Sequence, residues 1–172
     1  VVMSNKRQKV SVIGGAGHVG ATLGFILALK NYADVVLVDI AEGVPDGKAL
    51  DIAQAGPVLG YDVSVTGGSD FSLIAGSDIV VVTAGFPRKP GMDRIDLLKK
   101  NAAVIESVAV HIKEHAPESK VIVVTNPVDV MTYHMREKTG FSSERVMGQA
   151  GVLDGARFHY FLSRELQVSS QE

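Results

Sequence analysis

The sequence contains no cysteine, which excludes both a disulfide framework and a thiolate metal site. It has little net charge, −2 at pH 7, so there is no electrostatic case for binding nucleic acid or an anionic membrane surface. No apolar run approaches the roughly 18 residues that span a bilayer. The short apolar stretch at residues 10–13 is also too brief for the core of a signal peptide. We therefore expect a cytoplasmic protein that binds neither nucleic acid nor membrane.

The remaining composition is that of an ordinary globular protein, with 46% hydrophobic and 21% charged residues in a chain of 172. This length suffices for one domain with a substantial core and for the beginning of a second. There is no low-complexity tract and no internal repeat of short period.

Short β-branched apolar runs alternate with helical stretches along the chain. We expect strands at 10–13, 35–38, 63–66, 79–82 and 121–124, and helices at 21–30, 47–55, 97–115, 130–138 and 152–166. The second helix is expected to stop before Gly56 and Pro57. Continuously apolar strands that alternate with helices are typical of a parallel sheet covered on both faces. The predicted fold class is therefore α/β, with a doubly wound parallel sheet.

A glycine-rich turn follows the first expected strand and precedes the first expected helix. Its members are Gly15, Ala16, Gly17, His18, Val19 and Gly20. In a G-x-G-x-x-G sequence the first glycine allows a tight turn, the second admits a pyrophosphate, and the third lets the helix pack closely. The helix N-terminus then offers free N–H groups to phosphates. On its own the turn is a weak signal for a dinucleotide site, because glycine-rich turns are common.

Asp39 ends the second expected strand, at about the 20-residue separation from the turn that dinucleotide-binding folds show. A carboxylate there can accept hydrogen bonds from both ribose hydroxyls, although aspartate is also a good helix N-cap. It repels a 2′-phosphate, and neither Ile40 nor Ala41 supplies a cation to offset that repulsion. Together with the glycine turn, Asp39 indicates dinucleotide binding and favours NAD over NADP.

A basic segment at residues 83–94 follows another strand end, where open α/β sheets bind ligands. It contains Arg88 and Arg94, and arginine can hold a carboxylate with paired hydrogen bonds. The segment is either a lid that closes over an anion or a solvated basic loop. Asn126 follows a further strand and precedes a proline, so its amide either contacts a ligand or belongs to a turn.

Two groups of polar residues fall on expected helices. Asp154 and Arg157 are three residues apart, so they share a helix face and are able to form a simple i,i+3 ion pair. His111 and His115 have i,i+4 spacing beside Glu114, which superficially suggests a metal site. No further ligand is apparent, so we expect a solvated helix face there and no metal.

Taken in order, these segments resemble the lactate/malate dehydrogenase family, and in particular its lactate-dehydrogenase-like malate dehydrogenases of bacteria. The matching segments are the glycine turn, Asp39, the arginine segment and the runs at 47–51, 55–57, 96–98, 124–129 and 153–157. They cover nearly the whole chain in unbroken order. The resemblance implies an NAD-binding Rossmann fold over residues 1–148 and, over 149–172, the start of a truncated α+β catalytic domain.

The resemblance also implies roles for the matching residues. NAD would be held by the glycine turn and Asp39. Further cofactor contacts would come from Thr83, Ala84, Gly85, Asn101, Val124, Thr125 and Asn126. The substrate would contact Arg88, Arg94, Asn101, Asn126 and Arg157. Among these, Arg157 would clamp the carboxylate beside the reacting carbon and Arg94 would polarise the carbonyl. Arg88 would bind the second carboxylate of a dicarboxylate, at a position where lactate dehydrogenases usually carry glutamine.

The implied activity is reversible hydride transfer between malate and oxaloacetate, a reaction of the tricarboxylic acid cycle. It needs a histidine as general base, oriented by Asp154. In the family this histidine lies further along the chain than the arginine matched by Arg157, past the end of this sequence, and His159 points elsewhere on its helix. We therefore expect this chain to lack the base. The expected partner is a second copy, in a dimer or tetramer, or a complementary C-terminal fragment.

Three alternatives stay open at this stage. A lactate or other 2-hydroxyacid dehydrogenase is disfavoured by Arg88, because a monocarboxylate would leave that arginine unpaired. A non-catalytic NAD-binding module is favoured by the missing histidine and disfavoured by the intact substrate residues. An interaction protein would use the apolar stripe of Phe158, Phe161 and Leu162, although such stripes usually pack in a core.

Overall fold

A six-stranded parallel sheet forms the centre of the computed structural model, which describes residues 7–88 and 90–170. The strands are β1 (Lys9–Ile13), β2 (Asp34–Val38), β3 (Val65–Gly68), β4 (Ile79–Val82), β5 (Lys120–Val123) and β6 (Val146–Gly148). Their order is β3-β2-β1-β4-β5-β6. The order reverses between β1 and β4, so the sheet is doubly wound and the predicted fold class is confirmed.

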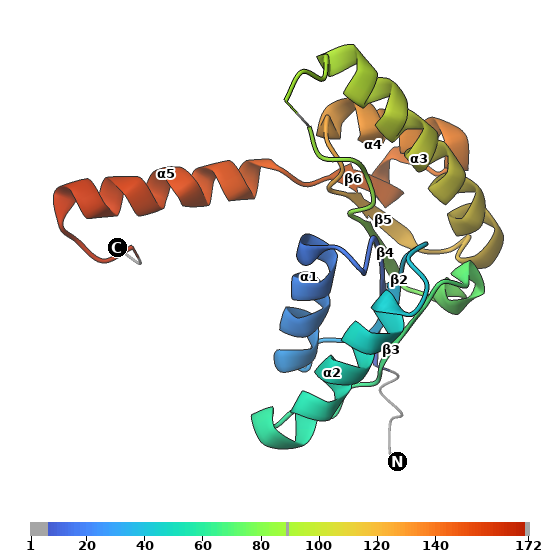
Figure 1. The fold of residues 1–172 in the computed structure, drawn as a ribbon, viewed down its shortest axis with the longest axis horizontal. Helices are drawn as coiled ribbons and strands as arrows, with labels where there is room; N and C mark the ends of the chain where they lie inside the picture. Colours follow the sequence, from blue (N-terminus) through green and yellow to red (C-terminus); the bar gives the residue numbers. More distant parts are fainter. Residues whose placement is uncertain (1–6, 89, 171–172) are drawn as a thin grey trace.

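Helices cover both faces of this sheet (Figure 1). One face carries α1 (His18–Leu29) and α2 (Val44–Leu59), and the other carries α3 (Arg94–His115) and α4 (Val128–Thr139). The 3₁₀ helices η1 (Phe71–Ile74) and η2 (Ser143–Arg145) lie in connections. The last helix, α5 (Gly151–Leu166), projects away from the sheet. No helix within 7–88 or 90–170 combines the length and apolar character needed to cross a membrane.

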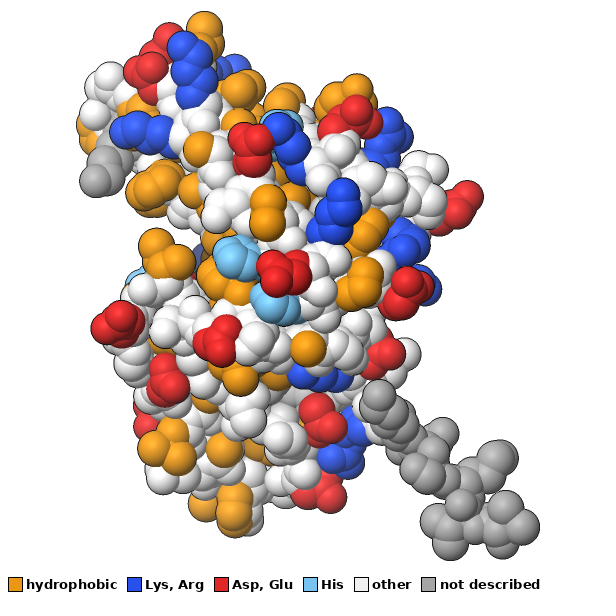
Figure 2. Space-filling model, turned by 90° about the vertical axis from the view of Figure 1, so that its right-hand side faces the viewer, with side chains coloured by type: hydrophobic (Ala, Val, Ile, Leu, Met, Phe, Trp, Pro, Cys, Tyr) orange, Lys and Arg blue, Asp and Glu red, His pale blue; other side chains and the backbone are white. Residues whose placement is uncertain are grey.

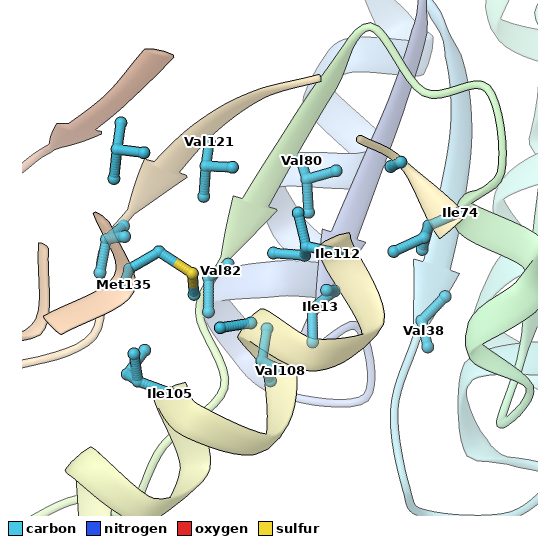
Figure 3. Close-up of a cluster of buried hydrophobic side chains, with 14 of the residues drawn as sticks. Ile13, Val38, Ile74, Val80, Val82, Ile105, Val108, Ile112, Val121 and Met135 are labelled. Carbon is cyan, nitrogen blue, oxygen red and sulfur yellow. The ribbon is translucent and has the colours of Figure 1, made fainter. Parts of the chain in front are cut away.

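Apolar side chains fill both layers because successive residues of a strand point to opposite faces. In the larger core, Ile13 and Val82 of the sheet pack with Ile112 of α3 and Met135 of α4, and all four side chains are buried (Figure 3). On the opposite face, Leu37 is buried beneath α1 and α2. This packing holds the carboxyl ends of β1 and β4 in fixed positions, and the candidate site lies there.

Helix α2 differs from the sequence prediction, which stopped it before Gly56. The helix continues through Pro57 and ends at Gly60, which adopts the left-handed conformation with φ 81°. Pro57 is exposed in the last turn, and the Tyr61 hydroxyl donates to the carbonyl of Ile52 and so fixes the chain that follows the helix. Pro57 lies in the last turn, where a proline disrupts a helix less than it does in the interior.

Other element boundaries shift by a few residues. Helix α1 begins at residue 18 rather than 21, α3 begins at 94 rather than 97, and β3 covers 65–68 rather than 63–66. The sequence did not predict β6. This strand has three residues, of which only Val146 is buried, so it leaves no periodic pattern to detect.

Candidate functional site

The glycine turn joins β1 to α1 at the carboxyl edge of the sheet. The amides of Gly14 and Gly15 both donate to the Val38 carbonyl, at 2.9 and 3.0 Å, which fixes the turn to the end of β2. A Cβ at Gly20 would overlap the carbonyl of Gly14, whereas one at Gly17 would meet only that oxygen, at 3.2 Å. Packing therefore requires glycine at position 20. Gly17 is exposed, and its missing side chain leaves the backbone open to a ligand.

The N-terminus of α1 is suited to an anion. The helix begins at His18 with Gly17 as N-cap, and among the described residues no side chain caps this end or adds a carboxylate to its first turn. The first N–H groups of a helix need partners outside it, and the helix dipole favours negative charge at this end. His18 and Val19 are exposed, so a phosphate can approach from solvent.

The carboxylate of Asp39 is bonded to the same turn. Its Oδ2 accepts a hydrogen bond from the Ala16 amide at 3.0 Å, and its Oδ1 accepts one from the Ala41 amide at 3.2 Å. Asp39 is not a helix cap, because α2 begins at Val44 with Gly43 as its N-cap. Each carboxylate oxygen retains a further lone pair, so acceptors for ribose hydroxyls are in place.

A cavity of about 770 Å³ adjoins the turn. Its walls include Gly17 and Asp39, residues 83–86 after β4, and one face of α3 that ends at His111. The sheet order reverses here, which is where open α/β sheets bind ligands. Its volume lies within the range of roughly 300–1,000 Å³ typical of cofactor sites. Phe71 of η1 also lines it, and sequence reasoning missed both Phe71 and His111 as wall residues because only the fold brings η1 to α3.

Two buried polar side chains connect the loops that follow β4 and β5. Asn101 accepts from the Phe86 amide at 2.8 Å and donates to the backbone carbonyl of Asn126 at 2.7 Å. The Thr125 hydroxyl donates to the carbonyl of Ala84 at 2.7 Å. The amide of Asn101 therefore positions both loops, and its contact with substrate or cofactor stays a prediction.

The other cofactor residues expected from the sequence lie at the same edge of the sheet. The Thr83 hydroxyl donates to the carbonyl of Ile13 at 3.1 Å, and the Val124 amide continues the ladder from β5 to β4. A Cβ at Gly85 would lie 2.6 Å from the methyl group of Thr125, so glycine is needed for the two loops to approach.

The arginines of the basic segment are both exposed. Arg88 lies in the loop before α3, and Arg94 is the first residue of that helix. A second cavity, of about 540 Å³, lies beside this loop and is lined in part by Gly91 and Lys99. Lys89 lies outside the described residues. The segment therefore lies beside the carboxyl edge of the sheet, where the cofactor is expected to bind; we call this the cofactor edge. A lid would occupy this position, and the substrate contacts of the segment stay predictions.

Asp154 and Arg157 lie elsewhere, on the projecting helix α5 (Figure 1). They form an ion pair with an N–O distance of 3.3 Å, and their side chains are 74% and 63% exposed. Within the described ranges, neither lines the cavities beside the sheet. The i,i+3 pair allowed by their spacing therefore forms, and the structure does not bring these two residues to the glycine turn. His159 is exposed on the same helix.

The histidine pair of α3 lies beside Glu114, as its sequence spacing indicates, and the expected absence of a metal there stays a prediction. One ligand atom from each of His111, Glu114 and His115 lies within 4.8 Å of the others. The i, i+3, i+4 spacing was the available signal, because it places all three side chains on one face of the helix.

A doubly wound sheet, a glycine turn at a helix N-terminus and a carboxylate at the end of β2 define a dinucleotide-binding Rossmann domain. The NAD binding domain of the lactate/malate dehydrogenases matches residues 8–148. The chain belongs to the lactate/malate dehydrogenase family, and NAD is the cofactor of this domain.

Solved structures of this family match along nearly the whole chain. Malate dehydrogenase from Picrophilus torridus, in its apo form, is 47% identical with a TM-score of 0.92, and the match covers 96% of this chain and 53% of that one. Lactate dehydrogenase from Cryptosporidium parvum, complexed with lactic acid and NAD, is 43% identical with a TM-score of 0.90, over 96% and 52%. Malate dehydrogenase from Salinibacter ruber is 46% identical with a TM-score of 0.89, over 96% and 52%. The chain therefore spans about half the length of these relatives.

Proposed function

We propose that this chain is the NAD-binding half of a malate dehydrogenase, and that residues 149–172 begin its catalytic domain. The observation that favours malate is Arg88, an exposed cation on the loop beside the cofactor edge. Overall sequence identity does not distinguish malate from lactate as the substrate, because a malate and a lactate dehydrogenase match this chain at 47% and 43%. Arg88 is suited to the second carboxylate of a dicarboxylate, which lactate and pyruvate lack.

In this proposal the cofactor binds at the carboxyl edge of the sheet, beside the glycine turn. When NAD is bound, its nicotinamide ring exchanges a hydride with the C2 carbon of the substrate. The N-terminus of α1 would receive the pyrophosphate, and Asp39 would accept from the ribose hydroxyls. Arg88 would bind the second carboxylate, and Arg94 would stabilise negative charge on the C2 oxygen. Asn126 would contact the substrate from the loop after β5.

The remaining roles fall on α5. Arg157 would hold the carboxylate next to C2, and Asp154 would orient a histidine base. Both now pair with each other in solvent. We therefore propose that a complementary segment covers the apolar stripe of α5 and supplies the base. A homo-oligomer, a cytoplasmic location and a role in the tricarboxylic acid cycle belong to the same proposal.

The experiment is NADH oxidation by the purified chain with oxaloacetate, and with pyruvate as the comparison. We expect any turnover to favour oxaloacetate, and Arg88→Gln to lower the ratio of kcat/KM values by about 100-fold, because the second carboxylate loses its cation. Arg136→Gln is the control, since this arginine lies on α4 and pairs with Glu137 at 3.1 Å. An unchanged ratio in Arg88→Gln would remove the basis for choosing malate.

A non-catalytic NAD-binding unit is the second candidate, and the position of α5 is the observation that favours it. NADH binding, followed by fluorescence titration, without turnover of either substrate selects this candidate. Failure to bind NADH would contradict both candidates.

A further inference from the structure

We propose that His111, Glu114 and His115 form a binding site for a divalent transition-metal ion, with Zn²⁺ as the preferred occupant. The three residues occupy one face of the last turns of α3, and a ligand atom of each lies within 4.8 Å of the others. Figure 2 shows two histidine side chains and an acidic side chain adjacent to one another on the surface.

The two imidazole rings are already arranged side by side. They are nearly parallel, at 8°, with centroids 6.2 Å apart. Phe71 of η1 stacks on His111 with a centroid distance of 4.0 Å, which restrains that ring from the side of a second element. Nε2 of His115 lies 3.9 Å from the carboxylate of Glu114. Tetrahedral Zn²⁺ with bonds of about 2.0–2.2 Å needs ligand atoms roughly 3.3 Å apart, so the side chains of Glu114 and His115 would rotate toward His111 when the ion binds.

Of the three side chains, His111 would be stabilised most by a bound ion. Its Nδ1 is buried and lacks a hydrogen-bond partner within the described part of the chain. A buried polar atom without a partner is costly, so coordination of the ion by Nδ1 of His111 would be stabilising. The side chains of His115 and Glu114 are 25% and 65% exposed, which gives an ion access from solvent.

A further carboxylate, that of Asp70, lies at the start of the neighbouring element η1 and is hydrogen-bonded to Ser72 rather than to the histidines. The carboxylate of Asp70 accepts from the amide and the hydroxyl of Ser72, at 2.8 and 2.6 Å. These bonds hold the pKa of Asp70 below its usual value. Asp70, the N-cap of η1, therefore carries negative charge next to Phe71, the residue that stacks on His111. Two imidazoles and one carboxylate suit Zn²⁺ and other late transition metals rather than Mg²⁺ or Ca²⁺.

The site can be separated experimentally from the cofactor cavity. His111 lines that cavity, whereas His115 and Glu114 are not among its wall residues. The ion would thus lie at the outer end of the cavity, and changes at positions 114 and 115 leave the walls intact. Binding of the metal alone does not depend on the proposed malate dehydrogenase activity.

The experiment is calorimetric titration of the untagged chain with ZnCl₂ in the absence of nucleotide. We expect one ion per chain, and we expect His115→Gln and Glu114→Gln each to weaken binding at least about tenfold, because each removes one of three ligands. The matched control is His159→Gln, since His159 is an exposed histidine on another helix. NADH titration of the same variants shows that they remain folded.

Two results would overturn the proposal. One is the absence of saturable Zn²⁺ uptake by the unaltered chain. The other is uptake that His115→Gln and Glu114→Gln leave unchanged, or that His159→Gln weakens instead, because the ion would then be bound elsewhere.

Discussion

The side chain of Asp39 is hydrogen-bonded to the backbone amide of Ala16, with an Oδ2–N distance of 3.0 Å. The end of β2 and the glycine turn are therefore fixed to each other. A site that is already ordered loses little entropy when a ligand binds. The groups proposed to receive the ribose and the pyrophosphate thus belong to one hydrogen-bonded unit.

Replacing Asp39 tests this unit directly. Asp39→Asn should weaken NADH binding by about tenfold or more, because a neutral amide offers one acceptor oxygen where the carboxylate offers two. It should also reduce discrimination against NADPH, since the repulsion of a 2′-phosphate is removed. Fluorescence titration with both nucleotides measures the two effects. Asp51→Asn, at an exposed position on α2, is the control, and equal affinities in the two variants would contradict the role of Asp39.

Alanine substitutions at two glycines of the turn should have different effects, one on the stability of the fold and the other on NADH affinity. Gly20→Ala should cost about 1–3 kcal/mol of unfolding free energy, because the new methyl overlaps the carbonyl of Gly14. Gly17→Ala should keep most of the stability and lose NADH affinity, because its methyl faces the ligand side. Gly47→Ala is the control: it lies in α2 with open space around it, and should gain about 0.5–1 kcal/mol with unchanged binding. Urea denaturation and NADH titration together distinguish these outcomes.

The sequence predicted the parts of this protein that depend on local patterns. The apolar runs of β1 and β4, the glycine turn and the position of Asp39 at the end of β2 all follow from residue type and spacing. The continuation of α2 through Pro57 did not follow, because Gly-Pro is a typical helix-ending signal and the local pattern does not show that the helix continues for another turn.

The candidate site was predictable only in part, for the same reason. The resemblance assigned Asn101 to the ligand, and that contact stays a prediction. The structural role of Asn101 was not predicted: its amide is bonded to the backbones of two loops. The ion pair of Asp154 and Arg157 follows from their i,i+3 spacing, whereas the projection of their helix (Figure 1) and the approach of Phe71 to His111 depend on tertiary arrangement. No spacing within a single element predicts these two features.

Substitution of Asn101 should lower the unfolding free energy more than substitution of the other polar residues of the site. Asn101→Ala removes hydrogen bonds to Phe86 and to the carbonyl of Asn126 and leaves both groups without this partner. We expect a loss of about 2–3 kcal/mol in unfolding free energy. Asn126→Ala is the control, because Asn101 bonds the backbone of Asn126 and not its side chain, and it should cost less than about 0.5 kcal/mol. Equal losses in urea denaturation would show that the hydrogen bonds of Asn101 do not determine the difference.

An ion pair between α3 and α4 should make stability depend on pH in the acid range. Glu106 pairs with Lys138, and the hydrogen bond and charge of that lysine lower the pKa of Glu106 from its ordinary value of 4.5. Because the folded-state pKa is the lower one, the pair contributes above pH 4.5 and its contribution is lost as the pH falls through the folded-state value. Glu106→Gln should therefore lower Tm more at pH 7 than at pH 3. A constant difference in Tm at both values would contradict this assignment, and Glu165→Gln on α5 is the control.

Helix α5 should contribute little to the stability of this chain on its own. Its apolar residues Phe158 and Phe161 are 70% and 67% exposed, whereas Met135 in the core is fully buried. Phe161→Asp should change the unfolding free energy by less than about 0.5 kcal/mol, and Met135→Ala should cost about 2–5 kcal/mol. Urea denaturation measures both. A loss above about 1 kcal/mol in Phe161→Asp would mean that α5 packs against the sheet domain in solution. Helix α5 would then lie closer to the sheet than Figure 1 shows, and the need for a complementary segment on α5 would be weakened.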